Sequence, residues 1–326
     1  MLSILDIVPV PEDCTPGDAL RRSIDLAQHA ERWGYNRYWI AEHHNMVGAA
    51  GAATGTVVAI VAGATSTMRV GAGGIMLPNH APLTVAEQFG TLESLYPGRI
   101  DLGLGRAPGT DQFTAQALRR DSARAIEFPQ EVAELQSYFS DPSPDQVVHA
   151  VPGAGLDVPI WILGSSASSG KLAASLGAPY AFASHFAPFE LSEAISVYRR
   201  NFTPSAYLGS PYVMPGVNVV VAETQREAER LFTSVQQRFL NIVRGTPSKL
   251  PLPVEDMTSL WSTSEASRVN AMLGLSFVGT PDVVRRQLLH FREETQADEL
   301  IVSATLYDAN ARLRSYELLA ELWEKS

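Results

Sequence analysis

Short apolar runs alternate with amphipathic segments along almost the whole sequence, and this alternation constrains the fold more than any other feature. Runs rich in Val, Ile and aromatic residues are typical of buried strands, whereas apolar residues spaced three and four apart predict helices. A regular succession of strand and helix favours one parallel α/β domain. The 326 residues suit a (β/α)8 barrel with an insertion, and a doubly wound open sheet is the alternative.

The pattern predicts the position of each element along the chain. Strands are expected over residues 3–8, 37–41, 68–72, 99–104, 159–163, 180–183, 212–222 and 300–303. Helices are expected over residues 18–33, 54–64, 83–95, 128–139, 168–176, 190–201, 225–243, 281–294 and 311–323. The polar segment 111–124 is expected to be loop and helix.

The alternation is interrupted in the C-terminal third. Residues 244–277 contain several prolines, Ser/Thr clusters and Trp261. An insertion of this kind is more often a lid or an interface than a separate domain. We therefore expect a single barrel domain over residues 1–326 that carries a lid at 244–277.

Charge and cysteine content limit the kinds of partner and compartment. The chain has 35 acidic and 25 basic residues, and a net charge of -10 argues against a non-specific nucleic-acid-binding protein. The single cysteine, Cys14, cannot form an intramolecular disulfide, which fits the reducing cytoplasm. No signal peptide is expected, because the N-terminus lacks a basic start and carries Asp6. The longest weakly polar run, 52–64, is too short to cross a membrane.

A polar cluster, Glu42-His43-His44, directly follows the strand predicted at 37–41. In an α/β barrel the catalytic residues lie at the carboxyl ends of strands. The two histidines could instead bind a metal, but neighbours in an extended chain point to opposite faces, so one ion cannot easily take both. The structural alternative is one packed and one exposed histidine. We expect at least one of them to be catalytic, as a general base, and no metal.

Three further strand ends carry residues that suit a phosphate-bearing ligand. Gly73-Gly74 could reflect close packing alone, or let a flat ligand approach the backbone. Arg106 could be a surface residue or could bind a phosphate. Gly164-Ser165-Ser166 could be an ordinary helix cap or a phosphate-binding helix start. His80 and His185 are weaker candidates at two other loops. Together these residues predict a mononucleotide site such as one for FMN.

The sequence resembles the bacterial luciferase-like family of flavin-dependent monooxygenases, most closely the single-subunit branch of unknown substrate. The similarity spans most of the chain and rests on five stretches: Ala41–Asn45, Val70–Pro78, Gly98–Arg106, Pro159–Ser166 and Phe277–Pro281. The resemblance implies a (β/α)8 barrel with a late insertion. It also implies a flavin cofactor and homodimers, with the helices at 54–64 and 83–95 as the candidate interface.

The resemblance assigns roles to the strand-end residues. His43 matches the catalytic base of the family, and Glu42 and His44 are its neighbours in the active site. Gly73-Gly74 falls where the family often has a non-proline cis peptide under the isoalloxazine ring. The residues that match flavin-phosphate ligands are Arg106, Ser165 and Ser166. In the light-emitting subunit a carboxylate replaces Ser165 and a thiol replaces Gly105, so the resemblance does not extend to light emission.

The expected activity is oxygenation of a small organic substrate with O2 and reduced FMN, in which the flavin carries the chemistry. No nicotinamide site is evident, so a separate flavin reductase is the expected electron donor. The alternatives are hydride transfer with a flavin or deazaflavin, a non-catalytic flavin-binding protein, and a metal hydrolase on a barrel.

Overall fold

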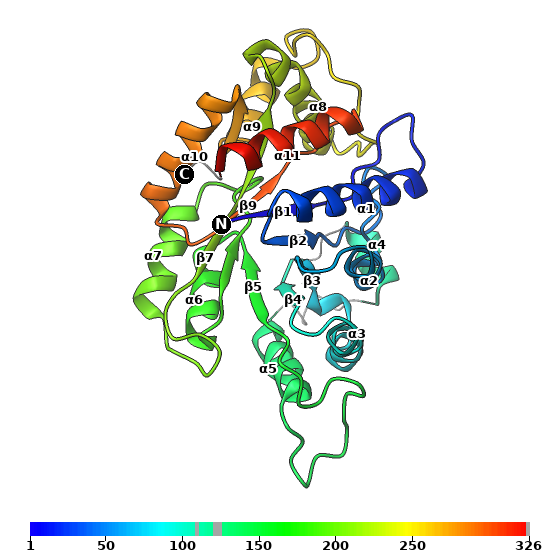
Figure 1. Ribbon diagram of the computed structural model, residues 1–326, viewed down its shortest axis with the longest axis vertical. Helices are drawn as coiled ribbons and strands as arrows, with labels where there is room; N and C mark the ends of the chain where they lie inside the picture. Colours follow the sequence, from blue (N-terminus) through cyan, green and yellow to red (C-terminus); the bar gives the residue numbers. More distant parts are fainter. Residues whose placement is uncertain (108–110, 120–125, 324–326) are drawn as a thin grey trace.

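Nine parallel strands form one sheet in the computed structural model, which describes residues 1–107, 111–119 and 126–323, and all of them except the eighth close into a barrel (Figure 1). The strands are β1 (Leu2–Asp6), β2 (Arg37–Ile40), β3 (Arg69–Met76), β4 (Ile100–Gly105), β5 (Ile160–Gly164), β6 (Tyr180–Phe182), β7 (Val213–Val221), β8 (Ser276–Gly279) and β9 (Leu300–Ser303). The order is sequential from β1 to β7, and β9 pairs with both β7 and β1. The predicted barrel is confirmed, and the open-sheet alternative is wrong.

Helices surround the ring of strands. They are α1 (Pro16–Arg32), α2 (Thr54–Ala64), α3 (Pro82–Leu95), α4 (Gln112–Ala117), α5 (Phe128–Phe139), α6 (Ala167–Leu176), α7 (Leu191–Asn201), α8 (Gln225–Arg244), α9 (Thr263–Met272), α10 (Pro281–Thr295) and α11 (Ala309–Trp323), with a 3-10 turn η1 (Leu77–Asn79). None of the helices within the described residues has the length and apolar composition needed to cross a membrane.

The helix boundaries follow from local capping. Thr15 and Asp18 form a capping box at the start of α1, where each side chain accepts a hydrogen bond from the backbone of the other residue. At the other end of a helix, Gly177 and Gly245 adopt the left-handed conformation and end α6 and α8. These caps explain why most predicted boundaries agree with the structure within a few residues.

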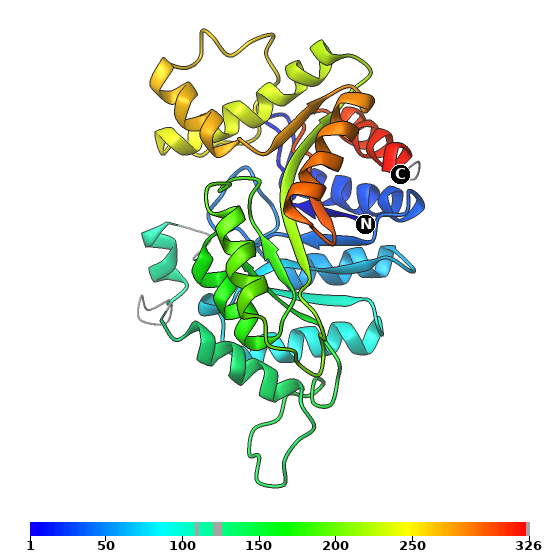
Figure 2. The same cartoon turned by 90° about the vertical axis from the view of Figure 1, so that its left-hand side faces the viewer.

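Two segments differ from the expectation. The third strand was predicted to end at Ala72, but β3 continues to Met76 through a bulge between Ala72 and Ile75. The segment 244–277 contains a regular helix, α9, whose Val269 packs against α8, and its last residues begin β8, a strand that was not predicted. Figure 2 shows α8 and α9 together on one flank of the molecule. In the polar segment 111–124, α4 is present, and residues 120–124 lie outside the described residues.

The amino end of the barrel is closed by a buried ionic network. Arg37 donates from Nε to both carboxylate oxygens of Glu299 at 3.1 Å, and from Nη1 to Asp101 Oδ2 at 2.8 Å. Both carboxylate side chains have no exposed surface. Arg69 and Trp39 also donate to Asp101. Charged groups thus link β2, β3, β4 and the start of β9, at the end of the barrel that is usually devoted to stability.

Candidate active site

A cavity of about 500 Å³ opens at the carboxyl ends of the strands. This volume lies within the range of ligand and cofactor pockets. The predicted site residues that line it are Glu42, His43, Gly73, Arg106, Gly164, Ser165 and Ser166. His44 and Gly74 are not among its lining residues. Most of the predicted site residues therefore lie around this one cavity, although they follow four different strands.

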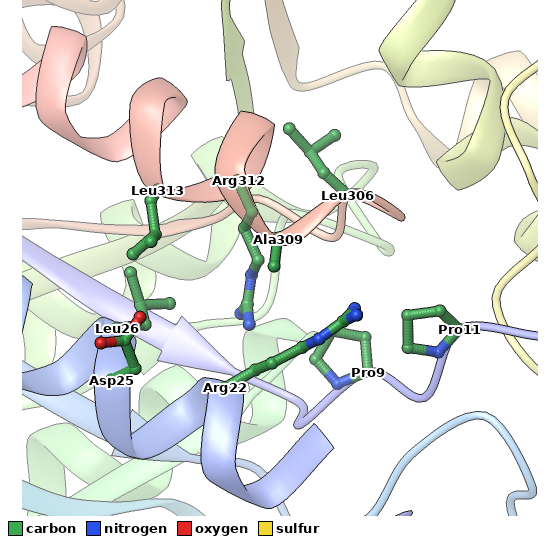
Figure 3. A pocket seen from close by; sticks show the side chains of 9 residues that line it. All are labelled: Pro9, Pro11, Arg22, Asp25, Leu26, Leu306, Ala309, Arg312 and Leu313. Atoms are coloured by element: carbon green, nitrogen blue, oxygen red, sulfur yellow. The ribbon is translucent and has the colours of Figure 1, made fainter. Parts of the chain in front are cut away.

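A second hollow lies between α1 and α11 and is shown in Figure 3. Its volume of about 30 Å³ matches one water molecule, so it is too small for a cofactor. Arg312, which reaches from α11 towards β1 at this place, pairs with Asp6 at 2.7 Å. This hollow is therefore a gap beside a structural ion pair.

Glu42 is the centre of a hydrogen-bond network beneath the cavity. Its carboxylate interacts with His44 Nε2 at 2.8 Å and with His80 Nε2 at 3.0 Å, and it accepts bonds from Asn79 and from the backbone N–H of Met76 at 3.2 Å. Burial opposes its ionisation, but the hydrogen bonds from the two imidazoles outweigh burial and lower the pKa of Glu42 to about 2. The carboxylate is therefore ionised and holds both rings in place.

The same network includes three side chains that could bind a metal ion. Ligand atoms of Glu42, His44 and His80 lie within 4.8 Å of one another, a spacing at which one ion could bind. The sequence considered His43 with His44, whereas the structure places His80 beside His44. In the structure both imidazoles are hydrogen-bonded to Glu42.

Two imidazoles line the cavity with their Nδ1 atoms enclosed by protein. Among the described residues, neither His43 Nδ1 nor His185 Nδ1 has a hydrogen-bond partner. Burial, together with the positive charge of Arg238, lowers the pKa of His43 to about 4 and that of His185 to about 3. Both rings are therefore neutral at pH 7, and each has one unprotonated nitrogen.

Arg238 was not predicted as a site residue from the sequence. Its positive charge nevertheless contributes to the lowered pKa of both His43 and His185. Burial alone lowers its pKa to about 10, so the guanidinium stays charged at pH 7. The expected helix at 225–243 contains several arginines, and its sequence pattern does not distinguish them. Arg238 could be recognised only after α8 was placed over the barrel.

Gly73 and Gly74 lie in β3, in the wall of the barrel. The peptide bond between them is cis, as the resemblance implies. A Cβ atom on Gly73 would lie 2.8 Å from Leu5 Cδ1 and 2.9 Å from Trp39 Cε3. On Gly74 it would lie 2.6 Å from the carbonyl oxygen of Gly103. Close packing therefore requires both glycines. Gly73 also lines the cavity, so a ligand can approach its backbone.

The turn between β5 and α6 attracts an anionic group. The backbone N–H of Ala167, the first residue of α6, donates to Glu190 Oε2 at 3.0 Å. The Ser166 hydroxyl does not cap the helix but bonds with Ser168 Oγ at 2.9 Å. Arg106, at the end of the adjacent strand β4, lines the same side of the cavity. Arg106, Ser165 and Ser166, which the sequence assigned to a phosphate, thus lie at one part of the cavity, where the Ala167 N–H is bonded to Glu190.

Comparison with known proteins gives consistent matches along the chain. Residues 3–299 match the family described as luciferase-like monooxygenase. The luciferase-like monooxygenase of Escherichia coli strain K12 is 50% identical over 324 residues, which cover 99% of this chain and 97% of that protein. The N-acetyl-S-alkylcysteine monooxygenase of Bacillus subtilis strain 168 is 31% identical over 328 residues, covering 98% and 97%. The solved structure of apo-MsnO8 superposes with a TM-score of 0.87 at 35% identity, covering 100% and 98%.

Proposed function

Because the chain belongs to the luciferase-like monooxygenase family, we propose that it oxygenates a small organic substrate with O2 and reduced FMN. One observation carries the proposal. A single cavity combines anion-attracting donors at the ends of β4 and β5 with two neutral imidazoles at the ends of β2 and β6. The first feature suits a flavin phosphate, and the second suits proton transfer beside a reacting group.

The residues present fit FMN. Arg106, Ser165 and Ser166 would hold the phosphate, because they line the cavity beside the N-terminus of α6. Gly73 would allow the flat ring to approach the strand, since it carries no side chain there. The cavity volume of about 500 Å³ accommodates a ligand of that class.

Bound reduced FMN would supply the electrons for oxygen chemistry, and the protein would orient and protect it. His43 would accept a proton, since burial and the charge of Arg238 lower its pKa to about 4 and leave the ring neutral at pH 7. Glu42 would position His44 and His80 through its network. Apolar side chains such as Trp39 in the cavity lining would limit access of water.

Arg106→Ala is expected to weaken FMN binding by about 1.5–3 kcal/mol, the scale of a hydrogen bond to a charged group. Wild-type protein should bind FMN more tightly than riboflavin, which lacks the phosphate, and the variant should lose most of that preference. Fluorescence titration with both flavins measures the two affinities. Arg226→Ala is the control, because Arg226 is exposed on α8 and pairs with Glu255. Equal affinity of the wild type for FMN and riboflavin would exclude a phosphate site here.

We further propose that a separate reductase supplies the reduced flavin and that the protein is a homodimer. The outward faces of α2 and α3 carry the partly exposed Glu87 and six exposed residues without charge: Thr56, Ile60, Gly63, Thr84, Gln88 and Thr91. A face of mainly small and uncharged residues suits contact with a second copy, and two-fold dimers are the commonest oligomers.

Ile60→Glu is expected to shift the dimer towards monomer, because it places a charge in the centre of that face. Light scattering at micromolar protein concentration should give twice the chain mass for the wild type and a lower mass for the variant. Ile242→Glu is the control, because Ile242 is exposed on α8, away from this face. A monomer mass for the wild type would contradict the dimer proposal.

A further inference from the structure

One methionine of this chain lies in the wall of the active-site cavity. All seven methionines fall within the described residues, and only Met76 is among those that line this cavity. Met76 is the last residue of β3, and its side chain is half-buried. The others lie elsewhere: Met68, Met214 and Met257 are buried, Met46 and Met272 are half-buried, and Met1 is exposed.

The position of the Met76 thioether is fixed by its neighbours. The backbone N–H of Met76 donates to Glu42 Oε2 at 3.2 Å, and Met76 is in register with Gly105 of β4. A Cβ atom on Gly105 would lie 2.8 Å from Met76 Sδ and 2.9 Å from Met76 Cε, so the thioether packs directly on the backbone of Gly105. Gly105 also lines the cavity. The sulfur is therefore held in the cavity wall.

This sulfur lies between the two places to which we assign FMN. Gly73, where the flat ring would approach the backbone, precedes Met76 on β3, and both residues line the cavity. Arg106, which would hold the phosphate, directly follows Gly105 on the neighbouring strand. An oxidant formed at the flavin would therefore meet the Met76 thioether before it leaves the cavity.

Thioethers are soft and polarizable, and their oxidation to the sulfoxide is a common reaction of proteins. Without a substrate, reduced FMN passes two electrons and two protons to O2, which becomes hydrogen peroxide. The sulfur lone pair then attacks one peroxide oxygen, the O–O bond breaks, and an S–O bond forms. The second oxygen leaves as water with both protons. The sulfur is oxidised by two electrons and the peroxide is reduced by two.

We propose that Met76 is the residue at which this protein oxidises itself when it reduces O2 without a substrate, and that the sulfoxide weakens flavin binding. This inference rests on the proposed function, because the peroxide comes from reduced FMN in the cavity. The sulfoxide places a polar group in a wall that is otherwise largely apolar and includes Leu5, Trp39 and Leu163. A protein without substrate thus stops consuming reduced flavin, and methionine sulfoxide reductases reverse the change.

The first experiment locates the oxidised methionine by mass spectrometry of tryptic peptides. The wild type is incubated in air with FMN, NADH and a flavin reductase, without substrate. Catalase is present and destroys peroxide that reaches the solution. Peptide 70–99, whose single methionine is Met76, should gain one oxygen atom. Peptides 1–21 and 269–285, which contain Met1 and Met272, should keep their masses. Met272 is the matched control, because it is half-buried like Met76 but does not line the cavity.

A second arm omits the flavin and catalase and adds hydrogen peroxide. Met1 and Met76 should both gain oxygen here, because Met1 is exposed and peroxide is small enough to enter the cavity. Arg106→Ala should lose most of the oxidation of Met76 in the first arm, since it binds FMN weakly, and should keep it in this arm. The two arms therefore separate the access of peroxide to Met76 from its formation at the flavin.

The effect on the cofactor is measured by fluorescence titration with FMN before and after peroxide treatment. The affinity of the wild type should fall about tenfold, the ratio expected for one buried polar group without a partner. Treatment with methionine sulfoxide reductases should restore it. Met76→Leu, a substitution of similar volume, should have the same affinity before and after peroxide. Met272→Leu should respond to peroxide as the wild type does.

The possible results separate this inference from the proposed function. Equal oxidation of Met1, Met272 and Met76 in the presence of catalase would overturn the inference, because the oxidant would then come from the solution. An unmodified Met76 in protein that binds FMN would also overturn it and would leave the proposed function standing. An unchanged FMN affinity after oxidation of Met76 would exclude the effect on flavin binding. Failure of the wild type to bind FMN would instead overturn the proposed function itself.

Discussion

His43→Ala is expected to lower the rate of substrate oxygenation by about a hundredfold to ten-thousandfold, the range for loss of a general base. His43 lines the cavity, and its Nδ1 has no partner within the described residues. FMN binding should stay close to normal, because the predicted phosphate ligands are on other strands. Reduced flavin and O2 should then yield hydrogen peroxide in place of product. The measurement is product formed per O2 consumed, with a substrate found by screening small organic molecules.

The lowered pKa of His43 determines the expected pH profile. Burial and the charge of Arg238 lower this pKa to about 4, so the unprotonated form is present at all pH values well above 4. The rate should therefore not change between pH 6 and 8 through this group, and should fall as the pH approaches 4. His44→Ala should have a milder effect, because His44 bonds to Glu42 and does not line the cavity. His290→Ala, at an exposed site on α10, is the control. A fully coupled reaction at normal rate in His43→Ala would show that this residue is structural.

Arg37→Met is expected to lower the free energy of unfolding by about 3–5 kcal/mol, the cost of removing one partner from a buried ionic pair. Arg37 is bonded to Glu299 and Asp101, and both carboxylate side chains are fully buried. Asp101 keeps its ion pair with Arg69 at 2.6 Å, whereas Glu299 loses its cation. Urea unfolding monitored by circular dichroism gives the free energy.

A second substitution tests this explanation. Adding Glu299→Gln to Arg37→Met should recover part of the lost stability, because it removes the carboxylate that the first change leaves without a cation. Arg226→Met, which breaks an exposed pair, should stay near the wild type. A loss below about 1 kcal/mol for Arg37→Met would mean that water or a rearranged side chain replaces the guanidinium.

The barrel was predictable because the apolar runs and the helical spacing in the sequence match the strands and helices of the fold. The run at 37–41 is apolar and ends abruptly at Glu42, so the position of the strand and the position of the site follow from the same residues. The helix at 128–139 was placed correctly, since its apolar residues keep one face. The extension of β3 was missed, because Gly73-Gly74 is read as the end of a strand and the bulge that continues it depends on the neighbouring strand.

The missing parts of the candidate site depend on contacts between distant segments. His80, which lies in the turn after β3, is hydrogen-bonded to Glu42, as His44 is. No spacing in the sequence predicts this contact. His185 was a weak candidate, because a single histidine after a short strand has many possible roles. No sequence pattern indicated Arg238, because it differs from the other arginines of α8 only in having no acidic partner among the described residues.

The closure of the ring through β1 and β9 affects how the chain folds during synthesis. Leu2 pairs with Leu300, and Arg312 donates to Asp6. Each of these contacts joins two residues that are far apart in the sequence, so the second is synthesised long after the first. Until β9 has left the ribosome, one edge of β1 is unpaired and open to pairing with other chains. Contacts between such distant residues also slow folding. Until β9 is made, the nascent chain is therefore exposed to aggregation, and a chaperone that covers the edge of β1 would increase the yield of folded protein.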